Sequence, residues 1–204
     1  MRIDWDFDRA VELTATVLSL VYLYLEIKEK KLLWFFGIVS SALYAWVFFH
    51  SHFYADFGLS VYYVVISVYG WVHWGKMGDN TGLPIKNITT KTLVGVAAAT
   101  VLCYLSLLGL LLYMPEYLGL ASSALPFVDS FTVAASITAT WMLSQKIIQH
   151  WYVWILVNAI SVAMFGVKGL YFTSGLYVVY TAGSIIGLMT WRRHFLDQCN
   201  TLNG

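Results

Sequence analysis

The chain contains little charge. Only 11% of its 204 residues are Asp, Glu, Lys or Arg, whereas 59% are hydrophobic and the mean hydropathy is +0.69. Soluble domains average about 25% charged and about 45–50% apolar residues. The composition therefore excludes an ordinary water-soluble fold and indicates a protein surrounded by membrane lipid. The net charge of +1 provides no general attraction to nucleic acid, so we expect no nucleic acid partner.

Cysteine and proline are also scarce. Cys103 and Cys199 have no spacing typical of a disulfide framework, a metal site or thiol catalysis. The sequence has no HExxH motif, no paired carboxylates and no nucleophile beside a base, so we expect no enzyme activity, no metal and no cofactor. The three prolines, Pro84, Pro115 and Pro126, lie between apolar segments or at their edges, where a missing N–H costs least.

The sequence is rich in long apolar runs. A membrane-spanning helix needs roughly 20 apolar residues, and about 17 suffice. Seven segments qualify and predict an all-α integral membrane protein with seven transmembrane helices. These segments are residues 11–27, 32–49, 53–75, 91–113, 127–143, 150–167 and 170–191.

Basic residues give the chain a direction in the membrane. Seven spans place most of them on one side, namely Lys28, Lys30, Lys31, Lys76, Lys86, Lys91, Lys146, Arg192 and Arg193; the other side has Arg2, Arg9 and Lys168. The positive-inside rule then predicts a multi-pass protein of the inner (plasma) membrane with its N-terminus outside and its C-terminus in the cytoplasm. Trp34, Trp74, Trp151 and Trp191 lie near helix ends, as in interfacial aromatic belts.

The sequence matches itself without a gap at an offset of 117 residues, which aligns Trp34 with Trp151 and Trp74 with Trp191. Each copy holds three segments, and the segment between the copies restores the direction of the second, so we predict a 3+1+3 arrangement of two parallel repeats. Transporters with parallel repeats bind substrate near the bilayer midplane. The alternative is a duplicated scaffold or channel subunit that transports nothing. The predicted parts are an outer tail (1–10), repeat 1 (11–76), a cytoplasmic connector (77–90), a linker helix (91–113), an outer connector (114–126), repeat 2 (127–193) and a cytoplasmic tail (194–204).

One face of the segment 150–167 has the composition of a binding site. Trp151, Trp154 and Asn158 are spaced i, i+3 and i+7, so they share one side of a helix. Asn158 lies roughly 12 Å into the helix, close to the middle of a hydrocarbon core about 30 Å thick. Polar side chains at that depth usually face a bundle interior or a cavity. The alternative for Asn158 is a hydrogen bond between helices.

Two further polar and aromatic stripes are related by the same offset. Ser60, Tyr63 and Ser67 form one, and Tyr177, Tyr180 and Ser184 form the other. If they face each other across the repeat axis they line a central cavity, whereas close helix packing also explains the serines. Gly37 and Ser41 stand where the second copy has Trp154 and Asn158, an asymmetry that suits a substrate with two unlike ends.

Acidic residues are missing from the middles of the predicted helices. Glu12, Glu26 and Asp129 lie at or near helix ends. Without a buried acid there is no evident proton relay or sodium site. We therefore expect facilitated diffusion of a small molecule.

The motif W-x-x-W-x-x-x-N in WYVWILVN, together with FYADFGLSVYYVVISVYGWVHW and DSFTVAASITATWMLSQK, resembles the Pnu family of bacterial vitamin transporters. The resemblance implies homotrimers of SWEET-like 3+1+3 protomers that carry vitamin precursors by facilitated diffusion, with an intracellular kinase that traps the product. It implies Trp151, Trp154 and Asn158 as substrate-binding residues. Family members often have Asn at Ser40, Gln at Ser60 and Asn at Ser67, so these departures leave nicotinamide riboside and thiamine as alternative substrates, with nicotinamide riboside favoured by the intact motif.

Overall fold

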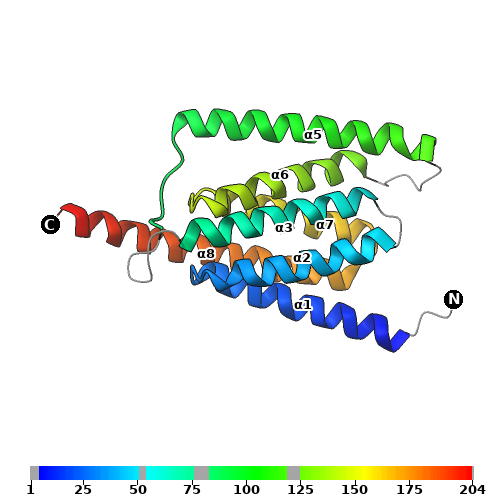
Figure 1. Ribbon diagram of the computed structural model, residues 1–204, viewed down its shortest axis with the longest axis horizontal. Helices are drawn as coiled ribbons and strands as arrows, with labels where there is room; N and C mark the ends of the chain where they lie inside the picture. The colour runs from blue at the N-terminus through cyan, green and yellow to red at the C-terminus, as the bar shows by residue number, and fades with distance from the viewer. Residues whose placement is uncertain (1–4, 51–53, 76–82, 119–124, 204) are drawn as a thin grey trace. The chain divides into compact units, whose positions relative to one another are not determined.

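The chain is all-α in the parts that the computed structural model describes, which are residues 5–50, 54–75, 83–118 and 125–203 (Figure 1). Seven helices lie within these residues, as the apolar segments predict. They are α1 (Trp5–Ile27), α2 (Leu32–His50), α3 (Tyr54–Gly75), α5 (Thr90–Leu118), α6 (Pro126–Ser144), α7 (His150–Val167) and α8 (Tyr171–Asn203). The chain divides into two compact units, residues 1–83 and residues 84–204.

Three helical segments in the described residues are long and apolar enough to cross a bilayer, namely Thr90–Tyr113, His150–Val167 and Tyr171–Thr201. Two shorter apolar helical segments, Thr16–Ile27 and Leu32–Trp46, accompany them. Helix α6 is less apolar because it buries hydroxyl groups, as at Ser130, Thr132 and Thr140. Thr132 and Thr140 donate to the carbonyls of Val128 and Ser136 in their own helix, which satisfies these groups without water.

Three of the helices, α1, α5 and α8, extend well beyond the apolar segments that predicted them. Helix α1 begins at Trp5 and α8 continues to Asn203, so most of the predicted outer tail and of the predicted cytoplasmic tail is helical (Figure 1). Helix α5 runs to Leu118 and includes Pro115, which was predicted to lie in a connector. Hydropathy marks where a helix stops being apolar, whereas helix ends depend on backbone hydrogen bonds. A proline near a helix end removes only one of these bonds.

In each of the two sets of three helices, α1–α3 in the first unit and α6–α8 in the second, the middle helix contacts both of the others. Helix α2 packs against α1 and α3, and α7 packs against α6 and α8. In the first unit Trp34 meets the edge of Trp74 at 5.6 Å between ring centroids. A Cβ atom at Gly70 would lie 2.4 Å from the ring of Trp34, so only glycine admits this contact.

The second unit has the same arrangement 117 residues later. Trp151 meets the edge of Trp191 at 5.8 Å, and a Cβ atom at Gly187 would lie 2.4 Å from the ring of Trp151. The predicted aromatic belt at these positions is wrong. Trp34, Trp151 and Trp191 are fully buried, and Trp74 is 6% exposed. They hold helices together instead of anchoring the protein at the lipid surface.

The α1–α2 turn of the first unit and the α6–α7 turn of the second unit also have corresponding geometry. Glu29 and Lys146, which are 117 residues apart, have φ values of 54° and 51°. The amide of Glu29 donates to the Glu26 carbonyl at 3.0 Å, and the amide of Lys146 donates to the Leu143 carbonyl at 2.8 Å. Each turn thus reverses the chain through one left-handed residue.

The segment before α5 is fastened to the second unit. Its Lys86 pairs with the α6–α7 turn as a short parallel bridge, donating to the Lys146 carbonyl at 3.0 Å and accepting from the Ile148 amide at 3.1 Å. The side-chain oxygen of Gln149 accepts from the Ile88 amide at 2.9 Å. Residues 77–82 of the predicted connector 77–90 lie outside the described residues, and from Pro84 the connector is part of this unit.

Candidate functional site

Asn158 is buried halfway along α7 and reaches α8. It is 5% exposed, and its amide nitrogen donates to the Ser184 hydroxyl at 3.1 Å. Ser184 in turn donates to the Tyr180 carbonyl at 2.8 Å. Asn158 has two N–H groups and an acceptor oxygen. Within the described part of the chain, the bond to Ser184 uses one N–H and leaves the second N–H and the oxygen for another partner.

Trp154 lies one turn before Asn158 on the same face of α7. Its ring is half-buried, and its indole N–H has no hydrogen-bond partner among the described residues. A buried indole N–H usually finds a partner. The two side chains thus offer unused donors and an acceptor next to a large aromatic surface, which is the composition expected of a pocket for a polar aromatic ligand.

Trp151 has a different environment from Trp154. It is fully buried, and besides Trp191 and Gly187 it contacts the His150 ring at 4.6 Å between centroids. These contacts fix the start of α7 against α8. A direct contact between Trp151 and substrate stays a prediction, whereas its packing role was not anticipated.

The aromatic stripe of α8 is extended by a residue of α7. The rings of Tyr177 and Tyr180 meet edge to face at 5.5 Å, and Phe165 stacks on Tyr177 at 5.2 Å with 23° between the planes. Phe165 was not among the site residues predicted from the sequence. Its match with Phe48 at the 117 offset was the available signal.

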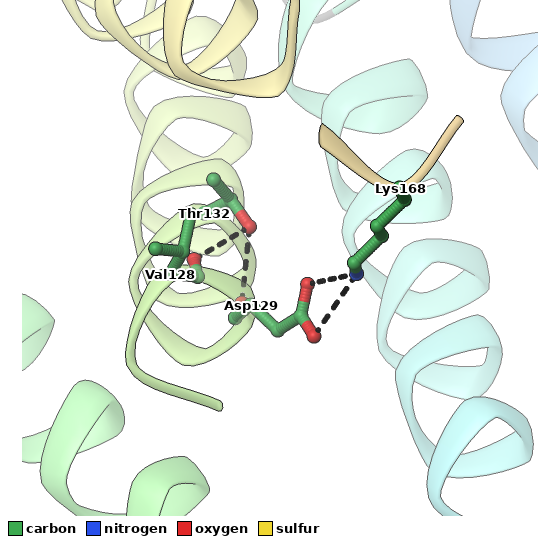
Figure 2. A network of polar contacts seen from close by, with 4 residues as sticks. All are labelled: Val128, Asp129, Thr132 and Lys168. Atoms are coloured by element: carbon green, nitrogen blue, oxygen red, sulfur yellow. Dashed lines mark hydrogen bonds and ion pairs between the residues drawn. The ribbon is translucent and has the colours of Figure 1, made fainter. Parts of the chain in front are cut away.

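An ion pair closes one end of the second unit. The Lys168 ammonium lies 3.0 Å and 3.3 Å from the two carboxylate oxygens of Asp129, and so joins the first turn of α6 to the turn after α7 (Figure 2). The same ammonium lies 5.9 Å from the centroid of the Phe165 ring. Both charged side chains are about one quarter exposed. The ion pair therefore stabilises this part of the second unit, next to the ring of Phe165.

The predicted site residues of the first unit lie on α2 and α3. Ser60 and Ser67 are 6% and 4% exposed. Ser40 donates to the Phe36 carbonyl at 2.7 Å within its own helix, which leaves only its oxygen for a ligand. Tyr63 contacts the ring of Tyr62 at 5.4 Å. That this stripe faces Tyr177, Tyr180 and Ser184 across an axis stays a prediction.

Glu26 corrects the expectation that no acid is buried. It lies in the last turn of α1 and is 4% exposed. Its place near a helix end suggested a solvated carboxylate, but burial is decided by the neighbouring helices and not by sequence position. A buried carboxylate in a charge-poor membrane protein is costly and is usually retained for a function.

Comparison with known proteins gives a consistent family. The profile described as nicotinamide mononucleotide transporter matches residues 9–193. The nicotinamide riboside transporter PnuC of Escherichia coli K12 is 26% identical over 204 residues, covering 89% of this chain and 84% of the relative. PnuC of Neisseria mucosa is 28% identical, covering 78% of this chain and 62% of the relative. The riboflavin/roseoflavin transporter RibM of Streptomyces davaonensis is 21% identical, covering 88% and 83%.

A solved structure agrees with these relatives. The crystal structure of the vitamin B3 transporter PnuC has a TM-score of 0.62 to this chain at 27% identity, covering 90% of this chain and 80% of that one. The match to the family profile extends from the start of α1 into α8 and so includes every proposed site residue. This chain belongs to the nicotinamide mononucleotide transporter family, a PnuC-like family of membrane transporters and not of enzymes.

Proposed function

We propose that this protein takes up nicotinamide riboside by facilitated diffusion, with an intracellular kinase that traps the product by phosphorylation. The observation that carries the proposal is the pairing of Trp154 with Asn158, whose unused hydrogen-bonding groups lie beside an aromatic ring in the middle of α7. The substrate named for two PnuC relatives agrees with it.

The chemistry of the ligand suits these side chains. Nicotinamide riboside has a cationic aromatic ring with a carboxamide, and a ribose with several hydroxyl groups. An indole or phenol face attracts such a cation by roughly 2 kcal/mol when water is excluded. The free N–H and oxygen of Asn158 can bind the carboxamide or the ribose hydroxyls. Trp154, Tyr177 and Tyr180 would provide the rings.

A repeat-based carrier is supported by contacts that recur 117 residues apart. The edge-to-face tryptophan pairs, the glycines beneath them and the left-handed turn residues recur at this spacing. We propose that these elements keep the three helices α1–α3 and the three helices α6–α8 rigid during transport. The proposal includes the homotrimer and the orientation with the C-terminus in the cytoplasm.

Uptake by purified protein in liposomes tests the proposal. We expect saturable uptake of radiolabelled nicotinamide riboside that does not respond to an imposed proton or sodium gradient. A clear response to either gradient would refute facilitated diffusion. Saturable uptake that the variant Trp154→Ala abolishes, while that variant remains folded, would distinguish a carrier from a scaffold or channel subunit.

Competition identifies the substrate. Unlabelled nicotinamide riboside, thiamine and riboflavin are added in turn to the same assay. We expect nicotinamide riboside to compete most strongly. Stronger competition by thiamine would assign the protein to the thiamine branch, and stronger competition by riboflavin would favour the function named for the RibM relative.

A further inference from the structure

The two units carry an aromatic residue on different helices at positions related by the offset of 117 residues. In the second unit Trp154 of α7 is the large residue, and Ala139 of α6 is small. The positions 117 residues earlier have the opposite sizes, Tyr22 on α1 and Gly37 on α2. Because the large and small residues are exchanged together, each unit keeps one ring.

Contacts in the first unit agree with this exchange. A Cβ atom built on Gly37 would lie 3.6 Å from the ring of Tyr22 and 2.7 Å from the Ser67 hydroxyl oxygen. Tyr22 therefore packs over the glycine and occupies the space beside it. The Cβ position of Gly37 that Tyr22 covers also lies against Ser67, which belongs to the predicted substrate-binding stripe.

Glu26 extends the same face of α1. It lies four residues after Tyr22, one helical turn away on the same side of the helix. The position 117 residues later is Leu143, so this carboxylate has no counterpart in the second unit. Among the carboxylates whose exposure the structure describes, Glu26 is the one that is almost completely buried.

We infer that Tyr22 and Glu26 form a part of the substrate site that selects ligands with a positively charged aromatic ring. The Tyr22 face would stack on the ring, and the Glu26 carboxylate would offset its charge. This inference rests on the proposed function and adds to it a residue pair that determines charge selectivity.

The test compares a charged and an uncharged form of one ligand. Nicotinamide riboside is cationic, whereas its 1,4-dihydro form keeps the carboxamide and the ribose but has no ring charge. Binding of both to purified protein is measured by calorimetry. The variants are Tyr22→Ala, Tyr22→Phe and Glu26→Gln. The matched controls are Tyr24→Ala, an exposed tyrosine of the same helix, and Glu29→Gln, an acid of the following turn.

We expect Tyr22→Ala to weaken binding of the cationic form by about 10- to 30-fold, and Tyr22→Phe to stay within about threefold of wild type. Glu26→Gln should weaken the cationic form about tenfold and the dihydro form less than about threefold. The controls should bind as wild type does. Equal loss of both forms in Glu26→Gln, or wild-type affinity in Tyr22→Ala, would overturn the inference.

The outcomes for wild type separate this inference from the proposed function. If wild type binds nicotinamide riboside and Trp154→Ala does not, the proposed function stands whatever the α1 variants do. If wild type binds thiamine and not nicotinamide riboside, the proposed substrate is wrong, and the same variants are compared with thiamine, whose thiazolium ring is also cationic. If wild type binds neither cation, both proposals are overturned.

Discussion

Variants of Asn158 give the sharpest test of whether a predicted site residue binds substrate or only packs helices together. Its bond to Ser184 at 3.1 Å joins α7 to α8, and bonds of this kind average about 0.6 kcal/mol in one membrane protein. If that bond is the whole role of Asn158, Asn158→Ala loses little stability and no affinity. If the free N–H and oxygen bind substrate, the same variant loses two ligand hydrogen bonds. At about 0.5–1.5 kcal/mol each, this weakens binding by about 5- to 150-fold.

Ser184→Ala removes the same bond between helices but keeps the Asn158 amide. We expect it to weaken binding by a smaller factor, about two- to fivefold, because Asn158 is then less well oriented. Leu156→Ala, at an exposed position of the same helix, should bind as wild type does. Calorimetry with nicotinamide riboside measures the affinities, and thermal unfolding in detergent measures the stability of each variant.

The result that would refute this reasoning is equal weakening by Asn158→Ala and Ser184→Ala. Equal effects would mean that the amide matters only through its bond to the neighbouring helix. Wild-type affinity in Asn158→Ala would remove this residue from the site altogether. A loss of folding in Asn158→Ala is recognised by thermal unfolding, and in that event Asn158→Gln, which keeps the amide group but displaces it by one methylene, should still weaken binding by more than Ser184→Ala does.

The remaining predictions concern stability and are read from thermal unfolding. Gly187→Ala should destabilise the protein by about 1–3 kcal/mol, because its Cβ would lie 2.4 Å from a fully buried tryptophan ring. Gly58→Ala, at a position with open space around it, should not destabilise the protein, and equal stability of the two variants would contradict the packing described. Glu29 has φ 54°, which a β-branched residue adopts poorly and glycine adopts readily, so Glu29→Val should lower the unfolding temperature and Glu29→Gly should not. A lower unfolding temperature for Glu29→Gly than for Glu29→Val would be evidence against a left-handed turn. Asp129→Asn should lower the free energy of unfolding by less than about 1 kcal/mol at low salt. Exchanging Asp129 and Lys168 for each other should restore the stability, and a loss that persists in the exchanged pair would argue against a stabilising ion pair.

The number of helices could be predicted from the sequence because lipid imposes a simple rule. A chain crossing hydrocarbon must satisfy its own backbone hydrogen bonds, so each apolar run of sufficient length forms a helix. Helix ends could not be predicted in the same way. The residues from His194 to Asn203 are polar but compatible with a helix, and α8 continues through them.

The role of the tryptophans was misread because hydropathy does not distinguish a ring against lipid from a ring against another helix. Trp74 and Trp191 each follow a glycine by four residues, Gly70 and Gly187. That spacing places a small residue one turn below each ring and leaves space for the tryptophan of the neighbouring helix. The glycine repeat was therefore the signal for packing, and it was visible in the sequence.

Burial of Glu26 could not be predicted for a related reason. Its helical position places it near the end of α1, where a carboxylate is usually solvated. Its exposure is only 4%, and its position in the sequence does not show which side chains cover it. The first unit has Tyr22 and Gly37 where the second has Ala139 and Trp154, and the sequence shows part of this exchange because Gly37 aligns with Trp154 in the repeat. It does not show which side chain fills the space beside the glycine.

That exchange explains how two copies of one unit can come to carry unlike groups at related positions. A packed interior does not tolerate a large change in volume, so a ring lost from one helix must be replaced from another. Glycine stands at position 37, where the second unit has Trp154, and it would leave a void unless a neighbouring helix supplied a ring. Tyr22 of α1 lies at that place. The ring then arrives from α1 together with Glu26, one turn away on the same helix. Compensation of volume thus places a ring on α1, and four residues later the same helix carries Glu26 where the second unit has Leu143.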